Sequence, residues 1–253
     1  MSETVRSISK ALYAVAILGI AVAAAAQSPI DQDWHQWSSD VCLKVLTDSP
    51  WVATAEVKNS KDVHRAVLLS SLLVRQAMLR QLQIQKKYDT MSPEKRQEFD
   101  DETSTCLTDP IYTQFIVIRA WGWPPGTPRS TGDADQLSIL EHGAKVSPAY
   151  VWTLHDYSAL SSCGDESFPW QYIPTAIDKE HEDWNRLHPG TLVPPDNKQL
   201  APIPALEFQY PRSVNGKPLI QPGDRTMVFD WGEKGGRFTF HLADLIYKDK
   251  LDF

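Results

Sequence analysis

The chain contains 253 residues, of which 42% are hydrophobic and 23% charged, and its formal net charge is −7 at pH 7. This acidic balance, with no local cluster of lysine and arginine, argues against nucleic acid as a partner, because nucleic-acid binding depends on cationic contacts to phosphate. The length suffices for one large domain or two small ones with a substantial core.

Residues 1–26 have the pattern of a secretory signal peptide. Arg6 and Lys10 precede an apolar run over residues 11–26, which ends in Ala24, Ala25 and Ala26. The run is shorter than the roughly 20 apolar residues that span a bilayer, so we expect cleavage after Ala26 rather than retention as a membrane anchor. The mature protein would then be secreted or periplasmic, and only the signal peptide would touch the membrane.

Residues 27–109 are predicted to form a helical part. Ser38 is an N-cap signal before apolar residues at helical spacing, and Ser49 with Pro50 suits the start of a second helix. The segment 90–93 opens a later amphipathic helix, which we expect to end near Thr105.

The centre of this part is residues 62–87, which we predict to form one long helix. Residues 66–74 carry no charge, and apolar side chains fall on nearly every side of the helix. The segment is too short and too polar at its ends to span a bilayer. We therefore expect other elements of the protein to cover it on all sides.

Residues 110–253 are predicted to be rich in β-structure, with strands at 111–118, 150–154, 168–173 and 206–210. The clearest signal is a terminal hairpin in which Met227, Phe229 and Trp231, and then Phe238 and Phe240, alternate with polar residues. One face of this hairpin is therefore aromatic.

Two connections in this part have patterns of their own. Asp133 and Gln136 can form a capping box for a short helix that Gly143 would end. Residues 175–204 are rich in proline and too long for a simple turn, so we expect a functional flap or an ordered wrap over the sheet.

These patterns together predict an α+β fold. A helical N-terminal layer packs against a mainly antiparallel β-sheet or sandwich with long proline-rich loops, and the aromatic face of the terminal hairpin covers the central helix. The expected parts are 1–26, 27–109 and 110–253, the last two forming either separate units or one continuous domain.

Three cysteines allow one disulfide in an exported chain. We favour Cys106 with Cys163, because both lie near the ends of predicted elements. Cys42 lies inside a helical pattern, where a small buried thiol is the usual state. The sequence leaves all three pairings open.

Catalytic and metal-binding motifs are weak. His181 and His188 have a spacing that zinc ligands can adopt, but no paired-cysteine or His-Glu-x-x-His motif accompanies them. Ser161 to Asp165 with His155 and Asp156 resembles a nucleophile turn but lacks the leading glycine of the hydrolase elbow. We therefore expect no metal site and no cofactor.

Nine tryptophans are the unusual feature of the composition. Four of them are candidate ligand-binding residues, since an exposed indole stacks on a flat apolar surface such as a sugar ring: Trp121, Trp123, Trp170 and Trp184. Two carboxylates among Asp133, Asp156 and Asp183 could then hydrolyse a glycosidic bond. The alternative interpretation, which we favour, is that these rings fill the interface between helices and sheet.

Four segments resemble a family of uncharacterised exported proteins of acidobacterial-type soil bacteria. They are residues 46–51, the helical stretch 63–82, Phe168 with Pro169, and the closing stretch 238–253. The resemblance implies export and a two-part architecture. It implies no catalytic residue, because the family has no assigned activity.

Our functional expectation is a non-enzymatic exported module that binds or scaffolds another envelope protein or a polysaccharide. The competing hypothesis is a secreted hydrolase or carbohydrate-binding protein that uses tryptophan platforms and acidic residues.

Overall fold

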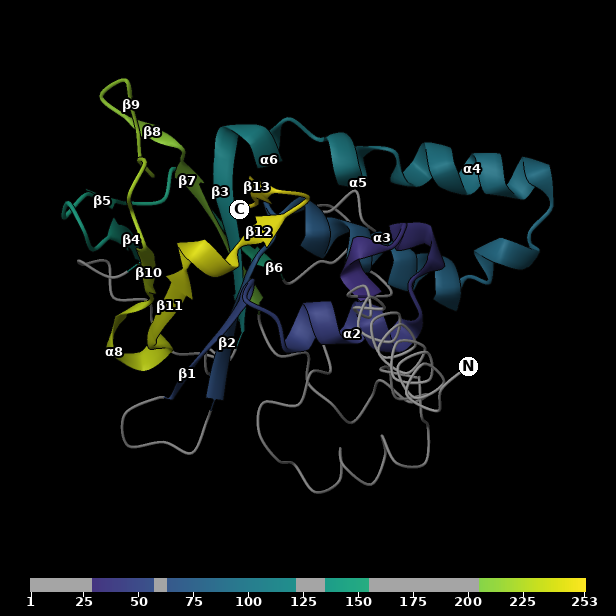
Figure 1. The fold of residues 1–253 in the computed structure, drawn as a ribbon, viewed down its shortest axis with the longest axis horizontal. Coiled ribbons are helices and arrows are strands. Elements are labelled where there is room, and N and C mark those ends of the chain that lie inside the picture. Colours follow the sequence, from purple (N-terminus) through teal and green to yellow (C-terminus); the bar gives the residue numbers. More distant parts are fainter. Residues whose placement is uncertain (1–28, 57–62, 122–134, 155–204) are drawn as a thin grey trace, which may run out of the picture.

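The computed structural model describes residues 29–56, 63–121, 135–154 and 205–253 (Figure 1). These residues form antiparallel sheets with helices packed to one side, so the predicted α+β class is confirmed. Among the helices in these ranges, none combines the length and the hydropathy needed to cross a bilayer.

The larger sheet has five antiparallel strands in the order β1-β2-β3-β7-β6. Their bounds are Val52–Glu56 (β1), Val63–Leu68 (β2), Phe115–Trp121 (β3), Ala205–Pro211 (β7) and Tyr150–Leu154 (β6). The strands predicted at 150–154 and 206–210 are confirmed. Because β1 and β2 pair into the same sheet as β3, a boundary at residue 109 would divide this sheet between two parts.

The second sheet has four strands in the order β11-β10-β4-β5. Their bounds are Arg237–His241 (β11), Thr226–Asp230 (β10), Gln136–Ile139 (β4) and Lys145–Val146 (β5). The terminal hairpin is confirmed, with Phe229 opposite Phe238 and Met227 opposite Phe240. One helical turn, α8 (Gly232–Gly235), connects its strands.

Two short ribbons complete the β-structure. They are β8 (Ser213–Val214) with β9 (Lys217–Pro218), and β12 (Ile246–Tyr247) with β13 (Lys250–Leu251). Lys248 and Asp249 join β12 to β13, and both have positive φ, as a two-residue turn between antiparallel strands requires.

The helices are short except for three. The longer ones are α2 (Ser39–Thr47), α3 (Leu72–Gln85) and α4 (Pro93–Thr103), and the remaining turns are η1 (Pro29–Asp31), η2 (Trp34–Gln36), η3 (Tyr88–Thr90), α5 (Thr105–Thr108), α6 (Ile111–Gln114) and η6 (Leu242–Asp244). The predicted caps are present, since the Ser38 hydroxyl accepts a hydrogen bond from Val41 N and that of Ser92 from Lys95 N.

The long helix predicted over 62–87 is only half correct. Residues 63–68 form β2, and the helix begins after the N-cap Ser71. A strand whose two faces are both largely covered lacks the apolar-polar alternation of a half-exposed strand, and a short continuous apolar run fits a buried strand as well as a buried helix. The expectation that the helix is covered all round is correct for α3, because residues 73–83 are all buried.

Buried cations on α3 explain how it can be covered all round and still carry charge. The Arg75 guanidinium donates to the carbonyls of Cys106 and Leu107 at 3.2 and 2.7 Å, and it lies 4.3 Å from the centroid of the Tyr112 ring. Arg80 donates to the carbonyl of Trp37 and to the Asp89 carboxylate. Each buried cation therefore has partners, as the low polarity of an interior requires.

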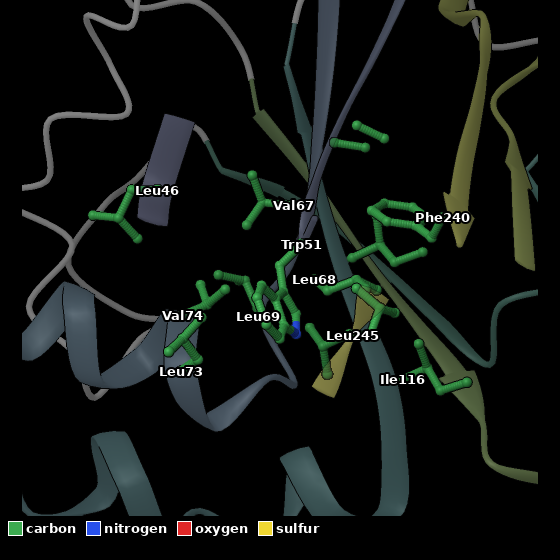
Figure 2. Close-up of a cluster of buried hydrophobic side chains, with 14 of the residues drawn as sticks. Leu46, Trp51, Val67, Leu68, Leu69, Leu73, Val74, Ile116, Phe240 and Leu245 are labelled. Atoms are coloured by element: carbon green, nitrogen blue, oxygen red, sulfur yellow. The ribbon is translucent and has the colours of Figure 1, made fainter. Parts of the chain in front are cut away.

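The element that covers α3 differs from the one predicted. Leu73 and Val74 of α3 pack in one cluster with Leu69, Trp51 and Leu245 (Figure 2). The aromatic face of the terminal hairpin packs instead on the larger sheet, where the Phe229 and Phe208 ring centroids are 4.9 Å apart. The prediction that this hairpin covers the central helix is wrong, because the sheet offers the wider apolar face.

Small residues allow the two sheets to approach each other. Ala53, Ala66 and Ala120 are register neighbours across β1, β2 and β3, and all three are buried. In the second sheet, Gly236 directly precedes β11 and has a φ of +93°. A Cβ added to Gly236 would lie 2.8 Å from the Cβ of Ala55 in β1. A larger side chain at either position would push the sheets apart.

Three further predictions are wrong at the level of elements. Ser49 and Pro50 form a turn into β1, residues 111–114 form α6 before β3 begins, and Gln136 lies in β4 instead of a capped helix. At Ser49 and at Gln136 a strand pairing, which the local sequence does not encode, overrides a capping signal, whereas at residues 111–114 a helical turn replaces the start of the predicted strand. The predicted strand at 168–173 and the connection 175–204 lie outside the described residues.

Candidate ligand-binding pocket

A pocket of about 230 Å³ lies where η1, α2, the turn into β1 and the start of α3 meet. Its lining is mainly apolar and consists of Pro29, Ile30, Val41, Lys44, Val45, Asp48, Ser49, Pro50, Trp51 and Leu73. The sequence analysis identified none of these residues as a binding residue.

Local sequence explains the shape of this pocket. Val41 and Val45 are one helical turn apart and therefore lie on the same side of α2. The helix ends at Thr47, and the Ser49 hydroxyl donates to the carbonyl of Val45 at 2.5 Å. Pro50 then directs the chain into β1, so helix and strand diverge and leave a space between them.

Trp51 forms a fixed wall of the pocket. Its side chain is buried, and its indole Nε1 donates to the carbonyl of Asp252 at 2.6 Å. Because its polar atom is already bonded to the protein, the ring presents only apolar surface to the pocket. The pocket is therefore formed before any ligand arrives.

Two opposite charges belong to the lining. Lys44 lies in the last turn of α2 and Asp48 is the C-cap residue that follows it, and both are exposed. Within the described part of the chain, no ion pair or side-chain hydrogen bond involves either residue. Asp48 does interact electrostatically with Arg65. Burial lowers the pKa of the Arg65 guanidinium, and the negative charge of Asp48 acts on that pKa in the opposite direction.

These charges differ in their relation to the helix. A lysine in the last turn is stabilised by the negative end of the helix dipole, whereas an aspartate at the C-cap is destabilised by it. The helix dipole therefore favours Lys44 and disfavours Asp48, whose charge interacts with Arg65.

A second cluster of charges lies in the larger sheet. Arg119 of β3 and Glu207 of β7 are register partners, and their side chains form an ion pair at 3.0 Å. Gln209 donates to the second Glu207 oxygen at 3.3 Å. Burial, aided by the nearby Glu207, raises the pKa of the Tyr112 phenol to about 12.

This second cluster serves the fold. The side chains of Arg119 and Glu207 are only 3% and 7% exposed, so a ligand in solvent has no access to them. A buried ion pair of this kind persists because removing one partner leaves the other charge uncompensated.

Only one of the four candidate tryptophans lies within the described residues. Trp121 ends β3 opposite Arg65, and Trp123, Trp170 and Trp184 lie outside the described residues. Asp133, Asp156, Asp183, the segment 161–165 and both histidines of the metal hypothesis also lie outside them. The carbohydrate and hydrolase hypotheses therefore stay predictions.

The cysteines are partly described. Cys42 is a free thiol and fully buried, and burial raises its pKa to about 12. Cys106 is also buried, and Cys163 lies outside the described residues. Because Cys42 is free, the disulfide predicted from the sequence would have to join Cys106 to Cys163. This pairing stays a prediction.

Within the described ranges, no three His, Cys, Asp or Glu residues are grouped so that they could hold a metal ion.

The comparisons with known proteins identify no relative. No protein-family model, no curated protein and no solved structure matches the chain.

One signal in the sequence points to the pocket in retrospect. Val41, Lys44, Val45 and Asp48 alternate apolar and charged residues along one side of a short helix that Pro50 follows.

Proposed function

We propose that the protein is an exported, non-enzymatic binding module of the cell envelope, and that the pocket beside α2 is its binding site. One observation carries the proposal: an apolar pocket whose lining includes two charges that form no ion pair within the described residues. Ligand sites commonly combine an apolar lining with a few polar groups that orient the ligand.

The electrostatics of the pocket favour binding over catalysis. A general acid or base needs a pKa near the working pH or a partner that activates it. Lys44 and Asp48 have no such partner among the described residues, and no serine, cysteine or histidine activated for nucleophilic attack lines the pocket. These groups can hold a ligand but have no chemistry to perform on it.

Binding is tested by NMR of the methyl groups that line the pocket. In protein labelled at isoleucine, leucine and valine methyls, a small apolar ligand should shift the signals of Ile30, Val45 and Leu73 and leave distant methyls unchanged. The variant Val41→Phe should abolish these shifts because the larger ring fills the pocket, whereas the exposed control Val214→Phe should not. No shift of these methyls by any member of a broad apolar panel would reject the pocket as a binding site.

Export is tested separately. Expressed in a Gram-negative host, the chain should appear in the periplasm or medium with Gln27 as its first residue, by N-terminal sequencing. An intact N-terminus in the cytoplasm would contradict export. Release of reducing sugar from a purified polysaccharide would favour the hydrolase hypothesis instead.

A further inference from the structure

We propose that the ligand of this pocket is a free α-amino acid with a branched or aromatic apolar side chain, bound as a zwitterion. This inference rests on the proposed function and names the chemical class of ligand. It follows from three properties of the pocket: its volume, its lining and its charges.

The volume sets the size of the apolar group. A dry apolar cavity of about 150 Å³ in another protein accommodates benzene. The present pocket, at about 230 Å³, accommodates a group of the size of a leucine or phenylalanine side chain with part of its backbone. A fatty acyl chain or a steroid would extend well beyond it.

The lining sets the polarity of that group. Ile30, Val45 and Leu73 present aliphatic surface, and Trp51 presents a ring whose nitrogen is already bonded. The Ser49 hydroxyl is likewise engaged with the carbonyl of Val45. A polar side chain would lose its hydrogen bonds to water and find no free donor among these groups, so apolar side chains are selected.

The charges set the head group. Lys44 lies in the last turn of α2, Asp48 is the C-cap residue that follows it, and both line the pocket, so the end of the helix presents a cation and an anion there. The carboxylate and ammonium of an α-amino acid are attached to a single carbon and match this arrangement. Lys44 would bind the carboxylate and Asp48 the ammonium.

The end of α2 strengthens the second contact. The C-terminus of a helix carries partial negative charge, which destabilises Asp48 in the free protein and attracts a cation. A bound ammonium would satisfy both the carboxylate and the helix end. A ligand with a carboxylate alone would place a second negative charge beside Asp48.

The test compares three ligands that share one side chain. L-Leucine carries both charges, N-acetyl-L-leucine lacks the ammonium, and L-leucinamide lacks the carboxylate. Binding is measured by calorimetry and by the shifts of the pocket methyls in the chain that begins at Gln27. We expect leucine to bind about tenfold more tightly than either derivative, the effect of about one charge-assisted hydrogen bond.

Charge-removing variants assign each contact. Asp48→Asn should weaken leucine about tenfold and leave N-acetyl-leucine unchanged, and Lys44→Gln should weaken leucine and leave leucinamide unchanged. Lys95→Gln and Glu98→Gln, on the exposed surface of α4, are the matched controls and should bind leucine as the parent protein does.

The outcomes separate this inference from the proposed function. If apolar compounds shift the pocket methyls with affinities that do not depend on either charge, the amino-acid assignment is wrong and the binding site stands. If N-acetyl-leucine or a peptide ending in leucine binds and leucine does not, the ligand is a peptide end and the assignment is again wrong. If no compound shifts the methyls, both proposals fail.

Discussion

Asp252 accepts hydrogen bonds at the N-terminus of α3, far from its own position in the sequence. Its carboxylate accepts from Leu72 N at 2.8 Å, from Leu73 N at 3.0 Å and from the Ser71 hydroxyl at 2.6 Å. The first backbone N–H groups of a helix have no partner within the helix, and a negative charge there is also favoured by the dipole. One residue therefore attaches the end of the described chain to the central helix.

Replacing Asp252 by alanine should lower the free energy of unfolding by about 2 kcal/mol, because helix N–H groups lose a charged acceptor. Urea denaturation measures the change. Asp244→Ala, at an exposed position of η6, is the control and should stay within about 0.5 kcal/mol of the parent. Equal stabilities of the two variants would show that Asp252 does not cap α3.

The buried phenol of Tyr112 gives stability a dependence on alkaline pH. Its pKa in the folded protein is about 12 against an ordinary value of 10.0, so the folded state holds the proton more tightly than the unfolded state does. Its contribution to stability is complete below pH 10 and is lost as the pH rises through 12. In a titration of phenolate absorbance, Tyr112→Phe should remove one tyrosine from the group that ionises last. Loss of a tyrosine that ionises near pH 10 would contradict this assignment.

At the scale of elements, the terminal hairpin joins the two sheets. Phe229 of β10 packs against Phe208 of β7 at 4.9 Å and against Phe238 of β11 at 5.5 Å, measured between ring centroids. Trp231 meets Phe208 at 5.9 Å. This hairpin therefore stabilises the packing of the two sheets. The helix α3 packs instead against α2, Trp51 and Leu245.

Phe229→Ala should destabilise the protein by about 3–5 kcal/mol, because it leaves a cavity between two sheets that cannot collapse easily. Thr239→Ala, on the exposed side of β11, removes no buried surface and should change stability little. Both values come from urea unfolding followed by tryptophan fluorescence. A cost for Phe229→Ala no larger than that of the control would show that the hairpin does not join the sheets.

At the scale of the whole molecule, contacts between distant parts of the chain hold its last residues in place. The indole of Trp51, at the start of β1, donates to the carbonyl of Asp252. Arg212 donates to the carbonyl of Phe253 and lies 4.5 Å from the centroid of its ring. The start of β1 and the segment after β7 are therefore both bonded to the last two residues of the chain.

The cysteines should divide into one disulfide and one inert thiol in the oxidised protein. Peptide mapping without reduction should recover Cys106 linked to Cys163. An alkylating reagent should label Cys42 only after denaturation, because its thiol is buried and its pKa is about 12. Replacing Cys106 and Cys163 by serine should cost roughly 4 kcal/mol for a loop of this length. A cross-link that contains Cys42 would contradict this pairing.

The local sequence by itself determined the fold class and the elements whose signals are complete within a few residues. Ser38 and Ser92 begin helices because a serine hydroxyl accepts from an N–H three residues ahead. The alternation from Met227 to Phe240 specifies a hairpin because strand side chains alternate between faces.

Only the tertiary structure decided the rest. Residues 63–68 pair with β1 and β3, and no local signal distinguishes such a covered strand from a helix. The aromatic face of the hairpin could pack either on α3 or on the larger sheet, and it packs on the larger sheet. The pocket arises where η1, α2, β1 and α3 meet, so it depends on contacts between segments that are separate in the sequence and could not be predicted from any one of them.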